Sequence, residues 1–288
     1  MPHKIKVTVV VENTAGAMGL LGEHGLALWI ETPDGRLLFD TGQGLALEHN
    51  AQRLEVPLAR ADAVVLSHGH YDHTGGLPAL LKRLGPIGVC AHPDALIRRY
   101  SKPRDGEARE VHTPELDRAA IESRRLRFVP TSKPTEIIPG LWATGEIPRT
   151  TSFEDTGGPF FLDADGTRPD LLPDDQAVYF RSRTGTVVLL GCAHAGVVNT
   201  LRYVRQLTDA APVHAVCGGM HLLRASPQRL EATCQALREL DVQVLGPSHC
   251  TGRQAVFTMW QQFPGRLVPF HAGARLEFDM FPAGGGSP

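Results

Sequence analysis

Residues 67–76 read Ser67-His68-Gly69-His70-Tyr71-Asp72-His73-Thr74-Gly75-Gly76, which places three imidazoles and one carboxylate within six residues. The apolar run Ala63–Leu66 precedes them and is typical of a buried strand, so the segment predicts a loop that presents side chains at a strand end. Imidazole and carboxylate groups bind Zn²⁺, Fe and Mn²⁺. His68 and His70 would lie on one side of an extended loop, whereas Asp72 and His73 would point elsewhere. The pattern therefore predicts ligands for two neighbouring metal ions, and the alternative is a histidine-rich turn without metal.

The composition of the 288-residue chain is ordinary for a globular protein, with 42% hydrophobic and 21% charged residues. The 29 Lys and Arg residues nearly balance the 31 Asp and Glu residues, so we expect no nucleic-acid partner. No apolar stretch approaches the roughly 18 residues of a membrane span, and the first residues lack the apolar core of a signal peptide. We therefore expect no membrane partner, and five scattered cysteines without zinc-ribbon spacing favour a reduced, cytoplasmic location.

The spacing of apolar residues predicts short strands in the first half of the chain and strands alternating with helices in the second. Strands are expected at Ile5–Val11, Leu26–Glu31, Arg36–Asp40, Ala63–Leu66, Ile87–Ala91, Leu126–Val129, Leu141–Thr144, Ala177–Arg181, Thr186–Leu190, Val213–Cys217, Val242–Leu245, Leu267–Phe270 and Ala274–Phe278. Helices are expected at Leu77–Leu84, Val197–Leu207, Pro227–Leu240 and Arg253–Phe263.

This order of elements favours an α/β (α+β) protein in which two mixed β-sheets pack face to face, with helices on both outer faces. We expect one domain over residues 1–280. Residues 98–118 are charged and broken by proline, which indicates a lid or an insertion. The glycine-rich residues 281–288 are expected to form a disordered tail.

Three later strands each lead into a turn of small residues that contains a histidine. The turns are Gly191-Cys192-Ala193-His194-Ala195-Gly196, Gly218-Gly219-Met220-His221 and Gly246-Pro247-Ser248-His249-Cys250-Thr251-Gly252. Glycines let the backbone approach a ligand closely, and the ends of neighbouring strands converge at one rim. We therefore predict that His194 and His249 bind metal. His221 is either a further ligand or a residue that contacts a ligand imidazole or the substrate.

Asp40 ends the apolar run Leu37-Leu38-Phe39 and precedes Thr41-Gly42. A carboxylate at such a strand end can orient a metal-binding imidazole by accepting a hydrogen bond from its free N–H group. The alternative is that Asp40 forms a simple Asx turn.

The order of Asp40, the H-x-H-x-D-H pattern from His68 to His73 and the late His249 resembles the metallo-β-lactamase fold superfamily. The resemblance extends from Ile5 to about Phe278 and implies an αββα sandwich with a dinuclear metal site on one edge. Further motifs are similar to the dihydropteroate-synthase-like branch, namely Glu23-His24-Gly25-Leu26, Gly191–Gly196, Gly218–Leu222 and His249–Gly252. That branch includes an archaeal enzyme that joins a dihydropterin to a ribofuranosyl-aminobenzene phosphate in methanopterin biosynthesis.

Most members of the superfamily carry a further histidine in the turn that this chain fills with Thr144–Arg149. Glu146 is a candidate substitute ligand in that turn. The other histidines in this part of the chain, His92 and His112, stand in contexts that do not suit metal binding.

Most members also place a bridging aspartate where this chain has Gly191-Cys192-Ala193-His194. We favour His194 for that role, and the softer thiolate of Cys192 is the alternative. Both departures concern the coordination of the second metal ion. They argue against β-lactam hydrolysis as the physiological activity.

The cofactors implied are two divalent metal ions, Zn²⁺ first, with Mn²⁺ or Fe as alternatives. They would lower the pKa of a water molecule and polarise an ester, amide or phosphoryl oxygen. Asp72 and His73 would then serve catalysis as well as metal binding. Arg149, His92 or His221 would steady an anionic group of the substrate.

We favour a metal-dependent hydrolase of a small ester, lactone or phosphoester. The first alternative is a dihydropterin transferase of the dihydropteroate-synthase-like type, which forms a C–N bond with an aromatic amine and releases diphosphate. The second alternative is a non-hydrolytic redox or metal-sensing module. The expected partner is a small-molecule substrate, anionic or pterin-like, and the chain is compatible with a homo-oligomer.

Overall fold

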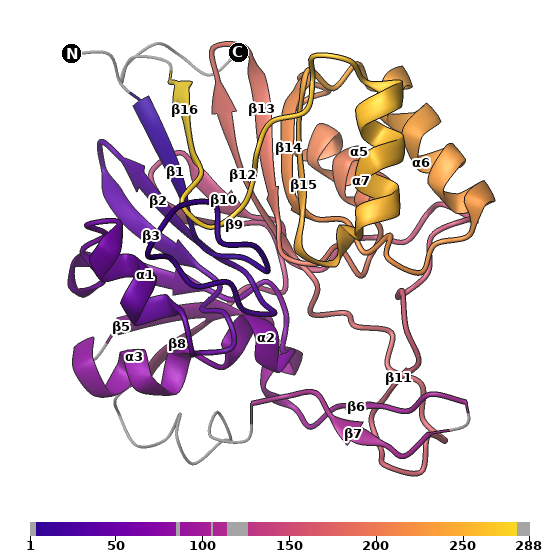
Figure 1. The fold of residues 1–288 in the computed structure, drawn as a ribbon, viewed down its shortest axis with the longest axis horizontal. Coiled ribbons are helices and arrows are strands. Elements are labelled where there is room, and N and C mark those ends of the chain that lie inside the picture. Colours follow the sequence, from indigo (N-terminus) through magenta and orange to yellow (C-terminus); the bar gives the residue numbers. More distant parts are fainter. Residues whose placement is uncertain (1–3, 85–86, 105, 114–125, 281–288) are drawn as a thin grey trace.

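The computed structural model describes residues 4–84, 87–104, 106–113 and 126–280. Two mixed β-sheets pack against each other, and helices cover the outer face of each sheet (Figure 1). The buried core between the sheets is apolar and draws residues from both halves of the chain. This αββα sandwich is the architecture that the sequence pattern predicts.

The first sheet has seven strands in the order β16-β1-β2-β3-β4-β5-β8. They are β1 (Lys4–Val11), β2 (Ala27–Thr32), β3 (Gly35–Phe39), β4 (Ala63–Val65), β5 (Ile87–Ala91), β8 (Leu126–Pro130) and β16 (Arg275–Asp279). Strands β3, β4, β5 and β8 are parallel, so the carboxyl ends of β3 and β4 lie at the same edge. Helices α1 (Leu47–Arg53) and α3 (Leu77–Leu84) cover the outer face, and α3 buries Leu77, Leu80 and Leu81 at helical spacing.

The second sheet has six strands in the order β15-β14-β13-β12-β10-β9. They are β9 (Thr135–Ile138), β10 (Leu141–Ala143), β12 (Ala177–Ser182), β13 (Gly185–Leu190), β14 (Val213–Gly219) and β15 (Val244–Ser248). Helices α5 (Val197–Leu207) and α6 (Pro227–Glu239) connect the parallel strands β13, β14 and β15, and α7 (Arg253–Gln262) follows β15. The register pairs Leu190 with Gly218 and Gly218 with Pro247, so the turns after these strands lie side by side.

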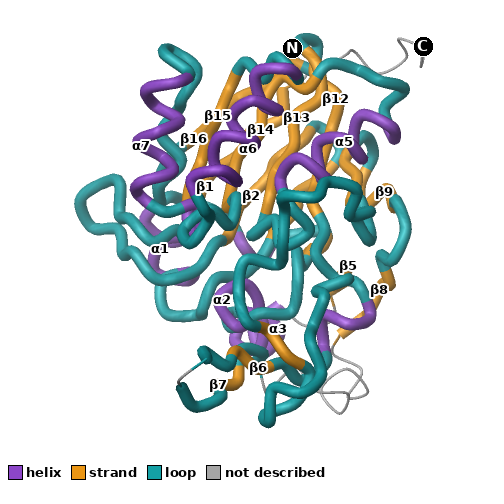
Figure 2. The backbone as a smooth tube through the Cα atoms, turned by 90° about the vertical axis from the view of Figure 1, so that its right-hand side faces the viewer, coloured by secondary structure: helices purple, strands orange, loops and turns teal. Residues whose placement is uncertain are grey.

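A third, small sheet joins part of the predicted lid to the second half of the chain. Its strands are β6 (Tyr100–Ser101), β7 (Arg109–Glu110) and β11 (Phe160–Phe161). Strands β6 and β7 lie beside α2 (Tyr71–Thr74) in both views (Figures 1 and 2), and the backbone of Tyr71 donates a hydrogen bond to Val111. Residues 105 and 114–118 of the predicted lid, and the predicted disordered tail 281–288, lie outside the described residues.

The predicted helices Leu77–Leu84 and Val197–Leu207 have the same bounds in the structure. The predicted strand Leu267–Phe270 is wrong, because only an isolated bridge joins Leu267 to Leu245. Pro269 lacks the N–H group that would continue a ladder. The structure adds α1 and β9, which the apolar spacing did not predict.

Three 3₁₀ helices complete the described elements: η1 (Leu58–Arg60), η2 (Pro93–Leu96) and η5 (His249–Thr251). None of the helices in the described part of the chain combines the length and apolarity that a membrane crossing requires.

Candidate metal centre

The carboxyl ends of the parallel strands in both sheets meet at one edge of the sandwich, and the six predicted ligands lie there. The loop after β4 carries the first two, α2 carries the next two, and the turns after β13 and β15 carry the last two. They are His68, His70, Asp72, His73, His194 and His249, and each is more than nine-tenths buried.

Three histidines form a first group. Nε2 of His68 lies 3.2 Å from Nε2 of His194 and 2.9 Å from Nδ1 of His70. Nδ1 of His194 donates to the carbonyl of Thr156 at 2.7 Å. Nδ1 of His68 lies 2.9 Å from the Ser67 hydroxyl, which accepts this hydrogen bond because it donates its own hydrogen to a carboxylate. With Nδ1 protonated in both rings, the two Nε2 lone pairs of His68 and His194 face each other.

Two histidines and a carboxylate form a second group. Nε2 of His249 lies 3.2 Å from Nε2 of His73 and 3.3 Å from Oδ2 of Asp72. Nδ1 of His73 donates to Asp40 at 2.6 Å, and Nδ1 of His249 donates to Asn13 at 2.8 Å. These hydrogen bonds direct the two Nε2 atoms at each other, as in the first group. When both rings are neutral, two Nε2 lone pairs face each other, and either a proton on His73 or a bound metal ion relieves their repulsion.

Cys192 belongs to both groups. Its Sγ lies 3.1 Å from Nε2 of His73. The sulfur lies within 4.8 Å of ligand atoms of His68 and His194, and equally of His73 and His249. His194, which we favoured as the bridging residue, lies in the first group only, and the thiol holds the shared position. Nitrogen, sulfur and carboxylate donors in this number fit Zn²⁺ or Fe.

The protonation states suit metal binding. Burial lowers the pKa of His68, His70, His194 and His249, so these rings are neutral at pH 7. Burial also raises the pKa of the Cys192 thiol well above its usual range. A bound cation would offset that burial cost and favour the thiolate.

Asp40 fixes the second group from a fully buried position. Its Oδ1 accepts a hydrogen bond from the backbone N–H of Ser67 at 2.7 Å. Its Oδ2 accepts from the Ser67 hydroxyl at 2.7 Å and from Nδ1 of His73 at 2.6 Å. The carboxylate therefore holds the loop after β4 and the ring of His73 together, which is the geometry that an orienting role requires.

Replacing Asp40 with asparagine is expected to weaken metal binding by about 10–100-fold, because the amide no longer fixes the tautomer and orientation of His73. Competition with a chelating dye measures the dissociation constant. The matched control is Asp34→Asn, in the exposed turn between β2 and β3, which should leave the constant unchanged. Wild-type affinity in the Asp40 variant would contradict the orienting role.

Metal binding is expected to strengthen as the pH rises to about 9. Burial lowers the pKa of His73, but the carboxylates of Asp40 and Asp72 outweigh burial and raise the pKa to about 9. In the metal-free protein His73 is therefore protonated at neutral pH, and a metal ion must displace that proton. The proton of His73 should contribute about a tenfold rise in affinity per pH unit up to its pKa, and the Cys192 thiol adds a further pH dependence of its own.

Calorimetry in buffers of different ionisation enthalpy measures the protons released on metal binding. The Cys192 thiol also loses a proton, so the comparison with Asp40→Asn isolates His73. Removing the carboxylate lowers the pKa of His73, so this variant should release fewer protons at pH 7. Equal proton release by both proteins would show that His73 is neutral before the metal binds.

Four residues of the site have a left-handed backbone that non-glycine residues rarely adopt. φ is 61° at Asp40, 56° at Ala193, 47° at His221 and 49° at His249. They make up four of the nine non-glycine residues with positive φ in the described ranges. Such strain clusters at functional sites, where the surrounding structure enforces it.

A buried ion-pair network supports the loop that carries His68 and His70. Arg99 donates from Nη1 and Nη2 to Asp174 at 2.5 Å and 2.7 Å, and from Nε to Asp170 at 2.7 Å. Asp174 also accepts from the backbone N–H of Gly69 at 2.8 Å. A Cβ at Gly69 would lie 2.5 Å from Nη1 of Arg99, so only glycine lets the loop approach this closely.

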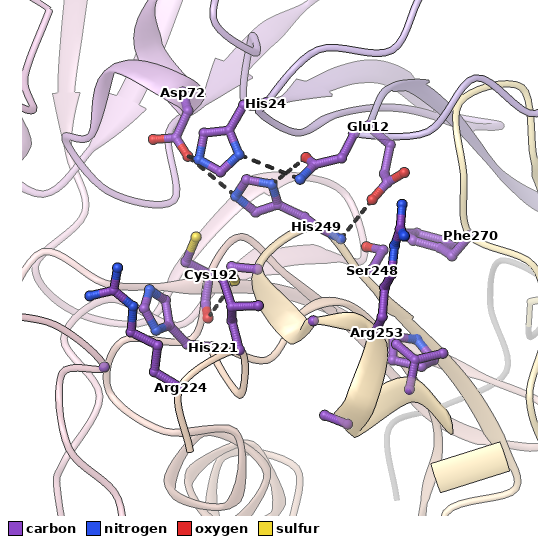
Figure 3. A pocket seen from close by; sticks show the side chains of 18 of the residues that line it. Glu12, His24, Asp72, Cys192, His221, Arg224, Ser248, His249, Arg253 and Phe270 are labelled. Atoms are coloured by element: carbon purple, nitrogen blue, oxygen red, sulfur yellow. Dashed lines mark hydrogen bonds and ion pairs between the residues drawn. The ribbon is translucent and has the colours of Figure 1, made fainter. Parts of the chain in front are cut away.

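A cavity of about 1200 Å³ opens beside the two groups. Asp72, Cys192 and His249 line one part of it, with His24 beside Asp72 (Figure 3). Typical ligand cavities measure about 300–1000 Å³, so this cavity can hold a substrate that extends well beyond its scissile bond.

Three residues of the site were not predicted from the sequence: Glu12, Asn13 and His24. Nε2 of His24 lies 3.2 Å from Oδ2 of Asp72. Asn13 accepts from the ring of His249, and Glu12 accepts from its backbone N–H at 2.7 Å (Figure 3). Glu12 and Asn13 directly follow β1, so polar residues at this strand end were the signal that could have indicated them.

The structure does not bring Glu146 or His92 to the two groups. Glu146 is exposed. His92 is buried elsewhere, where its Nδ1 accepts a hydrogen bond from the backbone of Asp94 at 3.1 Å and caps η2. The backbone of His112 forms an isolated bridge with His70, so the segment around His112 packs against the metal-binding loop.

The side chain of Arg149 contacts backbone carbonyl groups beside the site. Its guanidinium donates to the carbonyl of His194 at 2.7 Å and to the carbonyl of Leu171 at 2.6 Å. These contacts support the turn after β13. They occupy Nη1 and Nη2 of the guanidinium with protein carbonyl groups, so a role in holding a substrate anion stays a prediction.

His221 lies at the edge of the first group. Its ring centroid is 4.3 Å from that of His194, and burial lowers its pKa to about 4. It lines the cavity and forms a further set of ligand atoms with Cys192 and Cys250, all within 4.8 Å (Figure 3). The geometry allows both predicted roles, as a ligand and as a substrate contact.

Comparison with known proteins agrees with this fold. The family model of the metallo-beta-lactamase superfamily matches residues 21–249. The chain belongs to the metallo-beta-lactamase superfamily. The match spans the motif after β4 and reaches His249, so it covers the residues of both candidate groups.

Three relatives are similar over nearly the whole chain. A 7,8-dihydropterin-6-methyl-4-(beta-D-ribofuranosyl)-aminobenzene-5'-phosphate synthase of Methanocaldococcus jannaschii is 28% identical, over 95% of this chain and 97% of its own length. A ribonuclease Z of Salinibacter ruber is 26% identical, over 94% and 86%. The solved structure of a metal-dependent hydrolase of the beta-lactamase superfamily is 29% identical, with a TM-score of 0.81, and covers 96% of this chain and 99% of the other.

Proposed function

We propose that the protein is a metal-dependent hydrolase of a small ester, lactone or phosphoester, with two divalent ions, Zn²⁺ first, at the edge of the sandwich. The observation that carries this proposal is the two pairs of facing Nε2 atoms on either side of Cys192. Membership of the superfamily and the similarity to a solved metal-dependent hydrolase support it.

Each group would hold one ion. His68, His70 and His194 would bind the first, and Asp72, His73 and His249 the second, with Cys192 shared. When bound, the ions would lower the pKa of a water molecule and polarise the scissile bond.

Asp72 would orient the attacking water. Burial raises its pKa, but the charge of His73 and a hydrogen bond from His24 outweigh burial and hold the pKa well below its usual range. The ionised carboxylate lines the cavity, so it can accept a hydrogen bond from water. Because a group with so low a pKa is a weak base, its contribution is orientation of the nucleophile.

The test is turnover after metal removal and separate reloading with Zn²⁺, Mn²⁺ and Fe²⁺. The substrates are 4-nitrophenyl acetate, dihydrocoumarin and bis(4-nitrophenyl) phosphate, one for each class. We expect metal-dependent hydrolysis of at least one class, lost in His68→Ala and kept in His49→Ala, an exposed histidine of α1. Less than about one metal ion per chain, or no metal-dependent turnover in any class, would refute the proposal.

A second candidate is a dihydropterin-type synthase. The similarity to the Methanocaldococcus jannaschii synthase over nearly the whole of both chains favours it, as does a cavity large enough for two substrates. It predicts release of diphosphate from a dihydropterin methyl diphosphate, and only when an aminobenzene acceptor is present. Diphosphate release without the amine would identify a hydrolase instead.

A further inference from the structure

The cavity has an apolar side formed by α7 and the turn that follows β14. Phe257 and Trp260 stand three residues apart on one face of α7 and are 58% and 64% exposed. Their ring planes differ by 20°, and the centroids are 6.5 Å apart. Leu223, 66% exposed, lines the same cavity. We call Leu223, Phe257 and Trp260 the aromatic wall.

Two guanidinium groups line the cavity on different sides of the site. Arg224 lies beside His221, and Arg253 lies near Ser248 and Phe270 (Figure 3). Both side chains are exposed, and within the described residues neither makes a hydrogen bond or an ion pair. A planar guanidinium of this kind binds a phosphate or a carboxylate through two N–H groups.

The nearby carboxylate of Glu12 makes no ion pair with either arginine within the described residues. Its two oxygens accept hydrogen bonds from the backbone N–H groups of His249 and Thr14, each at 2.7 Å. The outer part of the cavity is therefore apolar on one side and positively charged on another. This combination complements a flat ring that carries a negative charge.

The aromatic wall is tied to the metal-binding groups. The backbone N–H of Leu223 donates to Cys250, the residue after His249, at 3.2 Å. Gly252 starts α7 with φ of 82°, and a Cβ there would lie 2.8 Å from Cα of Leu223. The close contact holds the turn and the helix at a set separation, and so fixes the wall relative to the two groups of candidate ligands.

We propose that the outer part of the cavity binds an aromatic group of the substrate, which is an anionic aryl compound. The ring packs on the aromatic wall, Arg224 and Arg253 hold the negative charge, and the scissile group lies at the metal-binding groups. The inference rests on the proposed function, because it names the substrate class of that same site. Three large apolar side chains remain exposed here because a ligand covers them.

Calorimetry on the metal-loaded protein tests the wall without turnover. The probes are 1-naphthylmethylphosphonate and methylphosphonate, which share the anion and differ in the ring. We expect the naphthyl probe to bind at least about tenfold more tightly, from stacking and burial of the ring. The double variant Phe257→Ala/Trp260→Ala should bind both probes equally. The control is Leu45→Ala, which removes a side chain that is 74% exposed and does not line the cavity. This variant should keep the preference for the naphthyl probe.

The arginines are tested with the same naphthyl probe and its neutral analogue, 1-naphthylmethanol. Arg224→Gln/Arg253→Gln should weaken the phosphonate severalfold and leave the alcohol unchanged. A naphthyl preference that survives loss of both aromatic rings overturns the inference, even if metal-dependent hydrolysis persists. The proposed function fails separately if the protein shows no metal-dependent turnover but still prefers the naphthyl probe.

Light scattering tests whether the aromatic wall is instead covered by a second copy of the chain. We expect Phe257→Ala/Trp260→Ala to have the same mass in solution as the wild type. A dimer that becomes a monomer in this variant, with the probe preference unchanged, would make the wall a subunit interface and overturn the inference.

Discussion

Replacing His68 with alanine is expected to remove metal from the first group and to lower kcat/KM by about a thousandfold or more. A catalytic metal ion contributes several kcal/mol of transition-state stabilisation, and each 1.36 kcal/mol is about tenfold in rate. Nε2 of His68 is the atom that both other histidines of its group approach, so no neighbour can replace it. Elemental analysis by plasma mass spectrometry, together with kcat/KM, checks the loss.

The variants of the two groups should differ in a defined way. His68→Ala and His249→Ala should each lose one ion and keep the other, because they belong to different groups. Cys192→Ala should weaken both ions, since its thiol is shared. His49→Ala, on the exposed side of α1, is the control and should keep full metal content and activity. Wild-type metal content in Cys192→Ala would contradict the shared position.

Replacing Arg99 with methionine is expected to destabilise the protein by about 3–5 kcal/mol, because two carboxylates are then left buried without their cation. The side chains of Arg99 and Asp174 are fully buried, and that of Asp170 is 1% exposed. Methionine keeps most of the volume, so the effect comes from charge. Thermal unfolding should shift down on the order of 10 °C for a chain of this size.

The consequence should reach the metal centre, because Asp174 holds the backbone of Gly69 between the first two metal ligands. We expect Arg99→Met to bind metal more weakly than wild type at a temperature where both are folded. Arg36→Met is the control, since its contact with Glu31 at 3.8 Å is on the surface and contributes about 0–1 kcal/mol. A melting temperature equal to that of the control would exclude a supporting role for the network.

Most of the architecture could be predicted because its causes are local. The apolar runs of β1 and β13, and the helical spacing of Leu77, Leu80 and Leu81, depend on neighbours in sequence. The strand at Leu267–Phe270 was predicted wrongly because its apolar run satisfies the pattern, whereas Pro269 prevents the ladder.

The candidate site was predicted in part for the same reason. Histidines in glycine-rich turns at strand ends are visible in the chain, so His68, His194 and His249 could be singled out. Asn13 and His24 were not singled out as site residues, because each acts through a contact with a residue far away in the sequence. Arg149 looked suited to a substrate anion, but the fold directs it to backbone carbonyls.

The sequence by itself determined the metal chemistry of this protein: residues 67–76 specify imidazole and carboxylate donors on a loop after a buried strand. The tertiary structure alone decided how those donors divide into two groups, why Cys192 is shared between them, and that an aromatic wall adjoins them. These features depend on the register of β13, β14 and β15 and on the packing of two sheets. Such contacts join residues more than a hundred positions apart, for which no local pattern exists.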